Sequence, residues 1–161
     1  MPNLTGYKHV LHGNTVTADT TAQVPVGSRA YDTAGGEWIY IRGTAATSNG
    51  TWVVYDLASD RTELLGRSGG FFGPVAITGT AITATQFGWA QIHGINRSAS
   101  TDTVAARAQL YVDGTSGRVD DAAATGSTVI GAISLSADET NVATVYISYP
   151  IWYGTAFVAF I

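Results

Sequence analysis

The chain has 161 residues, no cysteine and a formal net charge of −4. This length suffices for one domain with a full hydrophobic core, and the lack of cysteine excludes disulfides and thiolate metal sites. Only 12% of the residues are charged and Lys8 is the single lysine among eight basic residues, so the clustered basic face of a nucleic-acid-binding protein is not expected.

The first residues differ in pattern from the rest of the chain. Residues 1–30 are rich in Thr, Asn and Gly, which is typical of an irregular segment or of an arm that becomes ordered against a neighbour. Aromatic and β-branched residues then predict strands at 37–42 and 51–56, each preceded by a glycine-containing turn. Residues 60–65 fit either a short helical turn or an irregular strand. We therefore divide the chain into an N-terminal arm or irregular segment, 1–30, and one β domain, 31–161.

The second half of the chain continues as short strands. A glycine-framed aromatic pair predicts a loop over residues 69–74. Further strands are expected at 74–77, 81–83, 87–94, 107–112, 118–119, 129–135 and 143–149. The apolar stretch 142–161 is broken by Pro150 and Gly154, which indicates two strands or an extended tail. The prediction is an all-β fold, an antiparallel β-sandwich or β-barrel with an extended N-terminal arm and an apolar C-terminal tail.

Residues that could carry metal chemistry are few. His9 and His12 have a spacing that can chelate a metal, but no third ligand lies near them in the sequence, which favours solvated side chains. His93 lies on a predicted strand and is expected to be structural. The acidic pairs 120–121 and 138–139 could hold Ca²⁺, although turn positions favour solvated carboxylates. We expect no metal site and no cofactor.

Signatures of catalysis and of membrane insertion are also missing from the sequence. There is no Gly-x-Ser-x-Gly elbow and no phosphate-binding loop with a lysine. No apolar run approaches the roughly 18 residues of a membrane span, and the chain start does not resemble a signal peptide. The expectation is a protein that is not an enzyme and binds neither nucleic acid nor membrane.

Aromatic residues are the clearest functional signal. The chain has 4 Trp and 8 Tyr, and it uses Arg rather than Lys, a composition enriched at protein interfaces. We expect contacts from the N-terminal arm, from the loop after residue 66 and from the C-terminal tail, although the tail fits a last core strand equally well. The candidate contact residues are Tyr7, His9, Leu11, Arg67, Phe71, Phe72, Trp152, Tyr153, Phe157, Phe160 and Ile161.

Four stretches have a recognisable pattern of strand and turn residues: Phe87–Gly94 (FGWAQIHG), Ala106–Tyr111 (ARAQLY), Asp113–Val119 (DGTSGRV) and Ile130–Leu135 (IGAISL). Together they resemble small all-β head-decoration (cement) proteins of tailed double-stranded DNA bacteriophages. The resemblance covers residues 24–147, and Ile133 replaces a usually small residue. It implies a structural virion protein on the capsid exterior that binds the major capsid protein, stabilises the head and self-associates as a trimer or other homo-oligomer.

Two other functions remain open at this point. Exposed aromatics at Trp152, Tyr153 and the 71–72 pair would suit a tail-fibre or receptor-binding module that recognises host surface glycans. A hydrolase or lyase on a β-barrel would require the acidic pairs and His93 to converge in one cleft.

Overall fold

The computed structural model describes residues 9–11, 17–45, 47–67 and 71–154, and the part of the chain that it describes is all-β, with no helix. This confirms the predicted fold class. The strands are β1 (His9–Leu11), β2 (Arg29–Asp32), β3 (Glu37–Arg42), β4 (Trp52–Asp56), β5 (Arg61–Leu64), β6 (Gly73–Thr78), β7 (Phe87–Ser100), β8 (Gln109–Val112), β9 (Val119–Asp120), β10 (Thr128–Ser134) and β11 (Val142–Trp152).

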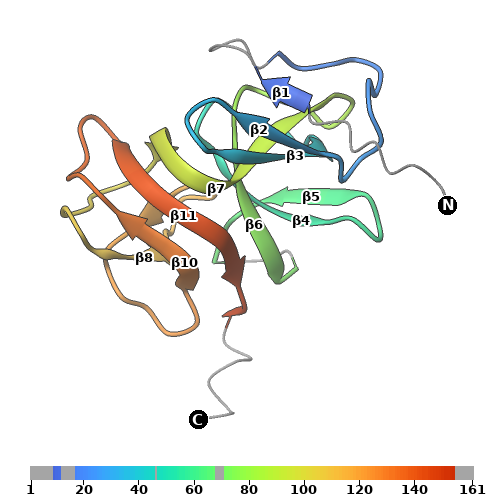
Figure 1. The fold of residues 1–161 in the computed structure, drawn as a ribbon. Helices are drawn as coiled ribbons and strands as arrows, with labels where there is room; N and C mark the ends of the chain where they lie inside the picture. Colours follow the sequence, from blue (N-terminus) through green and yellow to red (C-terminus); the bar gives the residue numbers. More distant parts are fainter. Residues whose placement is uncertain (1–8, 12–16, 46, 68–70, 155–161) are drawn as a thin grey trace, which may run out of the picture.

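One long strand connects two halves of the molecule. β7 spans 14 residues; its first part pairs with β3 and β6 and its second part pairs with β11. We call β2–β5 with residues 87–92 the N-terminal half, and β8–β11 with residues 93–100 the C-terminal half. Figure 1 shows the two halves on opposite sides of the molecule, with β6 and β7 between them. The strands form one continuous hydrogen-bonded sheet, in which all pairs are antiparallel except β1 with β2.

The layer formed by β4 and β6 has a core on each side. Trp52 and Ile77 face the larger cluster, which the C-terminal half completes with residues such as Val145 and Ile147. Val53 and Ala76 point the other way, into a cluster with Ile39, Ile41, Ala90 and Ile92. Because successive strand residues face opposite sides, a strand between two cores must be apolar at every position. This explains the continuous apolar run at residues 52–55.

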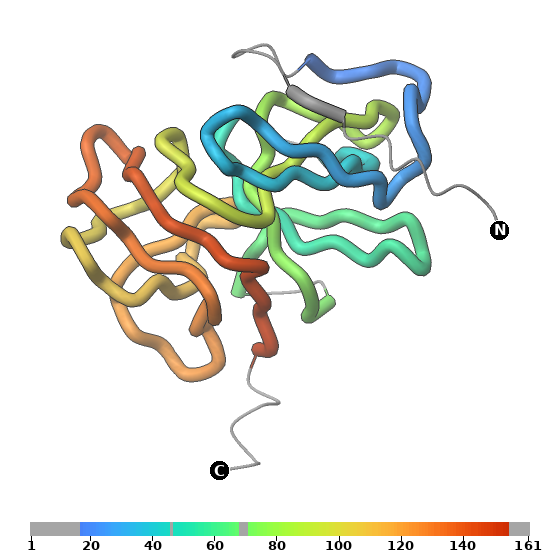
Figure 2. Tube along the Cα trace, in the orientation of Figure 1, coloured from blue at the N-terminus to red at the C-terminus, as the bar shows by residue number. Residues whose placement is uncertain are grey.

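A third cluster covers the outer face of β3 and of the first part of β7. Tyr40 and Trp89 lie there, and Val24 and Ala30 pack against them. Figure 2 shows the segment of residues 17–30, in blue, running beside β2 and β3. The Tyr40 hydroxyl donates to Asp19 Oδ2 at 2.7 Å and accepts from the Gln23 backbone N–H at 3.2 Å. Burial, together with the hydrogen bond to Asp19, raises the pKa of Tyr40 to about 12. Residues 17–30 are thus attached to the β domain, and the expected boundary after residue 30 falls inside β2.

One local expectation is wrong, and two that were left open are decided. Residues 81–83 are not a strand, because the Ile82 N–H donates to Thr47 Oγ1 and the Thr47 hydroxyl donates back to the Ile82 carbonyl, which leaves neither group for a ladder. Residues 61–64 adopt the strand alternative. The stretch from Val142 is a single strand that passes through Pro150 and ends at Trp152. The predicted strand at 74–77 is confirmed.

Candidate interaction surfaces

Exposed apolar side chains are concentrated on the C-terminal half. Ten large apolar residues are exposed among those described, and only Tyr31, Leu57 and Phe72 lie outside this half. The remaining seven are Ile95, Ile130, Ile133, Leu135, Val142, Tyr146 and Tyr149. Concentration of this kind on one region is what marks an interaction site, whereas scattered single residues need no explanation.

The strand register places three of these residues in a contiguous row. Tyr146 on β11 is directly opposite Ile133 on β10 and directly opposite Ile95 on β7. Their side chains are 37%, 41% and 51% exposed, respectively. Directly opposed residues on one sheet face have Cβ atoms about 5 Å apart, so the three side chains form one patch.

The same sheet face extends beyond the row and carries little charge. Leu135 and Val142 continue it by strand alternation, and we call Ile95, Ile133, Leu135, Val142 and Tyr146 the outer face. Arg97 is the only formally charged residue within residues 93–100, β10 and β11. An apolar face with this little charge is costly to leave in water and suits a protein partner.

A polar cluster marks where this face meets the N-terminal half. Glu37 on β3 is only 6% exposed; it accepts hydrogen bonds from Arg29 Nη1 at 2.5 Å and from the Tyr149 hydroxyl at 2.5 Å. Tyr149 has a φ of +47°, an unusual conformation for a residue with a side chain, and its ring lies 5.3 Å from that of His93. The cluster joins β3 to β11 across the boundary between the halves.

Ionisation of the cluster follows from these contacts. Burial alone would raise the pKa of Glu37, but the hydrogen bonds from Tyr149 and Arg29 outweigh burial and hold the pKa below its ordinary value. The same hydrogen bond to Glu37 raises the pKa of Tyr149. The cluster is therefore built to hold an ionised carboxylate beneath a neutral phenol.

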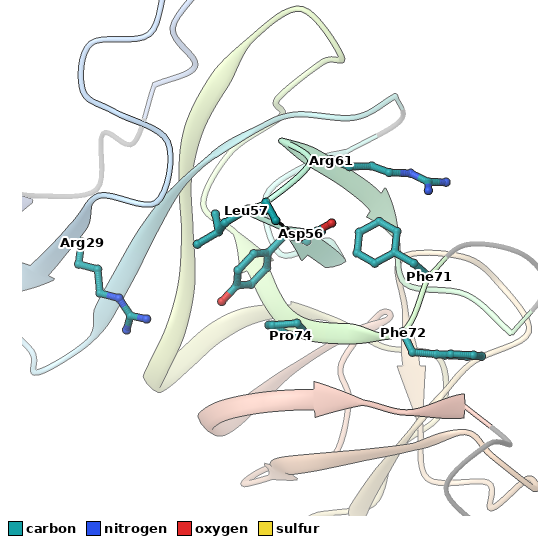
Figure 3. A pocket seen from close by; sticks show the side chains of 9 residues that line it. Arg29, Asp56, Leu57, Arg61, Phe71, Phe72 and Pro74 are labelled. Atoms are coloured by element: carbon teal, nitrogen blue, oxygen red, sulfur yellow. Dashed lines mark hydrogen bonds between the residues drawn. The ribbon is translucent and has the colours of Figure 1, made fainter.

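A groove lies between the β4–β5 hairpin and the start of β6 (Figure 3). Its volume is about 490 Å³, and its lining residues are Arg29, Tyr55, Asp56, Leu57, Ala58, Arg61, Phe71, Phe72 and Pro74. The Arg61 guanidinium lies 5.0 Å from the centre of the Phe71 ring, while Leu57 and Phe72 are 45% and 50% exposed. The groove is thus lined by apolar side chains together with three charged ones, Arg29, Asp56 and Arg61.

The predicted contact residues fall in several places. Phe71 and Phe72 line the groove, and Phe72 packs edge-on against Trp152 with ring centres 4.8 Å apart. Trp152 itself is 3% exposed and its indole N–H donates to the Gly126 carbonyl, so the expectation of a surface anchor there is wrong: the residue belongs to the core. Arg67 lies apart from both, and donates to the Val112 carbonyl and to Asp120.

Other predicted residues cannot be placed as contacts. Tyr153 follows β11 and is partly exposed. His9 and Leu11 belong to β1, whose side chains are not described. Tyr7, His12, Phe157, Phe160 and Ile161 lie outside the described residues.

The acidic pairs serve local structure. Asp121 Oδ2 accepts from the Ala105 N–H and Asp138 Oδ1 accepts from the Val104 N–H, so both carboxylates cap the same loop. Asp120 is 7% exposed, and burial raises its pKa to about 6 despite the nearby Arg67. Within the described ranges, no group of three or more His, Cys, Asp or Glu side chains could hold a metal ion.

The outer face was missed at the level of sequence. A signal exists: in residues 129–135 and 142–147 apolar side chains occupy both alternating positions, as they also do in the doubly buried β4. The sequence pattern by itself does not separate a strand between two cores from a strand with one core and one exposed apolar face.

Comparison with protein-family models, with curated proteins and with solved structures gives no match to this chain. Among the residues that the structure describes, no helix has the length and apolar character needed to cross a membrane.

Proposed function

We propose that this chain is a structural virion protein, without enzymatic activity, that binds the exterior of a phage capsid and stabilises the head as a decoration protein. The major capsid protein is its partner in this proposal, and the outer face is the docking surface. One observation carries the proposal: the contiguous apolar row of Ile95, Ile133 and Tyr146 on β7, β10 and β11.

Two further features support docking on a large protein surface. The row lies on regular strands, so its side chains are held in place before binding and little conformational entropy is lost on association. Low charge favours contact with an apolar protein surface over contact with nucleic acid. Many copies on one shell would add their contacts through avidity. The resemblance to cement proteins supports a capsid as the surface to which the outer face binds.

The test is co-sedimentation of the purified protein with undecorated capsids of a tailed phage that carries it. We expect saturable binding by the unchanged protein and at least tenfold weaker binding by Ile133→Ser and by Tyr146→Ser, because each removes a central apolar contact. Tyr31→Ser is the matched control, since Tyr31 is exposed to a similar extent on the N-terminal half. Absence of binding by the unchanged protein, or equal binding by all variants, refutes the proposal.

The glycan-binding alternative has a narrower basis. Trp152 is buried and unavailable for stacking on a sugar, which leaves Phe71, Phe72 and Tyr153 from the residues first considered. A glycan array that gives strong, Phe72-dependent hits while capsid binding is absent would favour this alternative.

A further inference from the structure

The groove between the β4–β5 hairpin and β6 has exposed apolar side chains on two sides, beside the charged Arg29, Asp56 and Arg61. Leu57 forms one wall, and Phe72 with Pro74 forms the other (Figure 3). Tyr55, which also lines the groove, is only 7% exposed and belongs to the second core cluster. A segment that filled the groove would therefore extend an existing core and cover the two exposed side chains.

The end of β11 brings the chain to the rim of this groove. Ile151 and Trp152 pair with Pro74 and Gly73, which open β6. Gly154 then has a φ of +61°, and a Cβ built on it would lie 1.9 Å from Phe72 Cε1, so the chain leaves the strand in contact with the groove wall. Only glycine combines this backbone conformation with so close an approach of the ring.

The residues that follow have the composition of an apolar ligand. Residues 155–161, Thr-Ala-Phe-Val-Ala-Phe-Ile, contain no charge and four large apolar side chains, and they lie outside the described residues. An extended chain advances at most about 3.6 Å per residue, so Phe157 can lie up to about 11 Å from Gly154, and the whole segment can span about 25 Å. A short tether also gives such a segment a millimolar effective concentration at a neighbouring site.

We propose that residues 155–161 bind in the groove of their own chain and place Phe157 between Leu57 and Pro74. The groove is then an intramolecular docking site, and the segment stabilises the β4–β5 hairpin against β6. This inference does not depend on capsid binding, because the groove and the outer face lie on different strands and use different residues.

Engineered cysteines test the position directly, because the chain has none of its own. Leu57→Cys is combined in turn with Ala156→Cys, Phe157→Cys and Val158→Cys, which allows for the narrow geometry of a disulfide. Under mild oxidation we expect at least one pair to form an intramolecular disulfide quickly, as seen by mass spectrometry and non-reducing electrophoresis. Thr115→Cys with Phe157→Cys is the control; Thr115 lies exposed in the β8–β9 turn, and this pair should remain reduced.

Two results overturn the proposal. If no pair that includes Leu57→Cys closes faster than the control, the segment does not lie in the groove. If the disulfides form only between chains, the occupant is the segment of a second copy.

A coupling measurement provides an independent test. Removing residues 155–161 should lower the melting temperature by several degrees in the unchanged background, and by less than half as much in Leu57→Ser, because the groove contact is already weakened there. Equal losses in the two backgrounds contradict the proposal. Capsid binding measured on the truncated chain distinguishes this inference from the proposed function, which requires the outer face instead.

Discussion

β7 has covered aromatic side chains at one end and an exposed apolar side chain at the other. In the N-terminal half, residues 17–30 pack over Tyr40 and Trp89 and satisfy the Tyr40 hydroxyl. In the C-terminal half, Ile95 lies on the same strand beside Tyr146, and both remain exposed among the described residues. The comparison shows that the protein's own chain covers the apolar side chains at one end of β7 and leaves those at the other end exposed.

The buried carboxylates of the two halves also differ. Glu37 has two donors and a lowered pKa. Asp120 has a raised pKa, and its Oδ1 is buried without a hydrogen-bond partner within the described part of the chain. Glu37 and Asp120 should therefore contribute to stability with opposite pH dependence.

The largest effect should come from removing the covered aromatic residue. Tyr40 is fully buried, and Tyr40→Ala should lower the free energy of unfolding by about 3–5 kcal/mol through the cavity and the lost burial. Tyr146→Ala on the open face is the matched variant and should cost less than about 1 kcal/mol. Urea denaturation of both proteins measures the difference. Similar losses for the two variants would show that the open face is covered in solution by the protein itself.

The second effect is the pH dependence that Asp120 contributes. Its pKa of about 6 lies above the ordinary 3.8, so the folded state retains the proton while the unfolded state has already released it. The contribution to stability is complete below pH 4 and is lost as the pH rises through 6, by up to about 3 kcal/mol at 1.36 kcal/mol for each pKa unit.

Chemical denaturation at pH 4 and at pH 7.5 measures this loss. Asp120→Asn should show a smaller drop between the two pH values, and the exposed Asp102→Asn should behave like the unchanged protein. If stability falls equally in all three proteins, Asp120 does not bind a proton in the folded state near neutral pH.

A smaller effect of opposite sign should come from Glu37. Because its folded pKa is lowered, its contribution is present above the ordinary pKa of 4.5 and is lost as the pH falls below it. Tyr149→Phe removes one of the two donors, and should cost about 1 kcal/mol at neutral pH and reduce the loss on acidification. Tyr31→Phe controls for removal of an exposed hydroxyl close to Glu37, because Tyr31 is opposite Glu37 in the β2–β3 pair. If Tyr149→Phe loses as much stability on acidification as the unchanged protein does, Arg29 is the partner that lowers the pKa of Glu37.

The smallest effect on stability should come from the outer face itself. Ile133→Ser and Ile95→Ser should each change the free energy of unfolding by less than about 1 kcal/mol, since both side chains are about half exposed. Their effect should appear in self-association or in partner binding, which analytical ultracentrifugation and capsid co-sedimentation measure separately. A large loss of monomer stability in either variant would mean that the face is part of the core.

The sequence by itself determined the all-β class, most of the strands and the turns between them. Alternation and glycine-rich turns predicted β3, β4, β6 and β10 close to their observed positions, because strand formation depends on nearest-neighbour geometry and on turn chemistry. The groove itself was not predicted, although two of its lining residues, Phe71 and Phe72, were predicted as contact residues. Trp152 was expected at the surface although it is buried, because the sequence around an aromatic residue that follows a proline does not distinguish a buried position from an exposed one.

Only the tertiary structure determines which apolar sheet faces are buried by other parts of the chain. Trp52 and Tyr146 both occur in strands that are apolar on both sides, yet the first lies between two cores and the second faces outward. Register between strands far apart in the sequence placed Ile133 beside Tyr146 and Ile95, and no local pattern encodes that pairing. Long-range packing also explains why residues 81–83 do not form a strand. The Thr47 hydroxyl satisfies both the N–H and the carbonyl of Ile82, which are then not available to a neighbouring strand. Burial depends on what lies above a sheet, and that is a property of the whole chain.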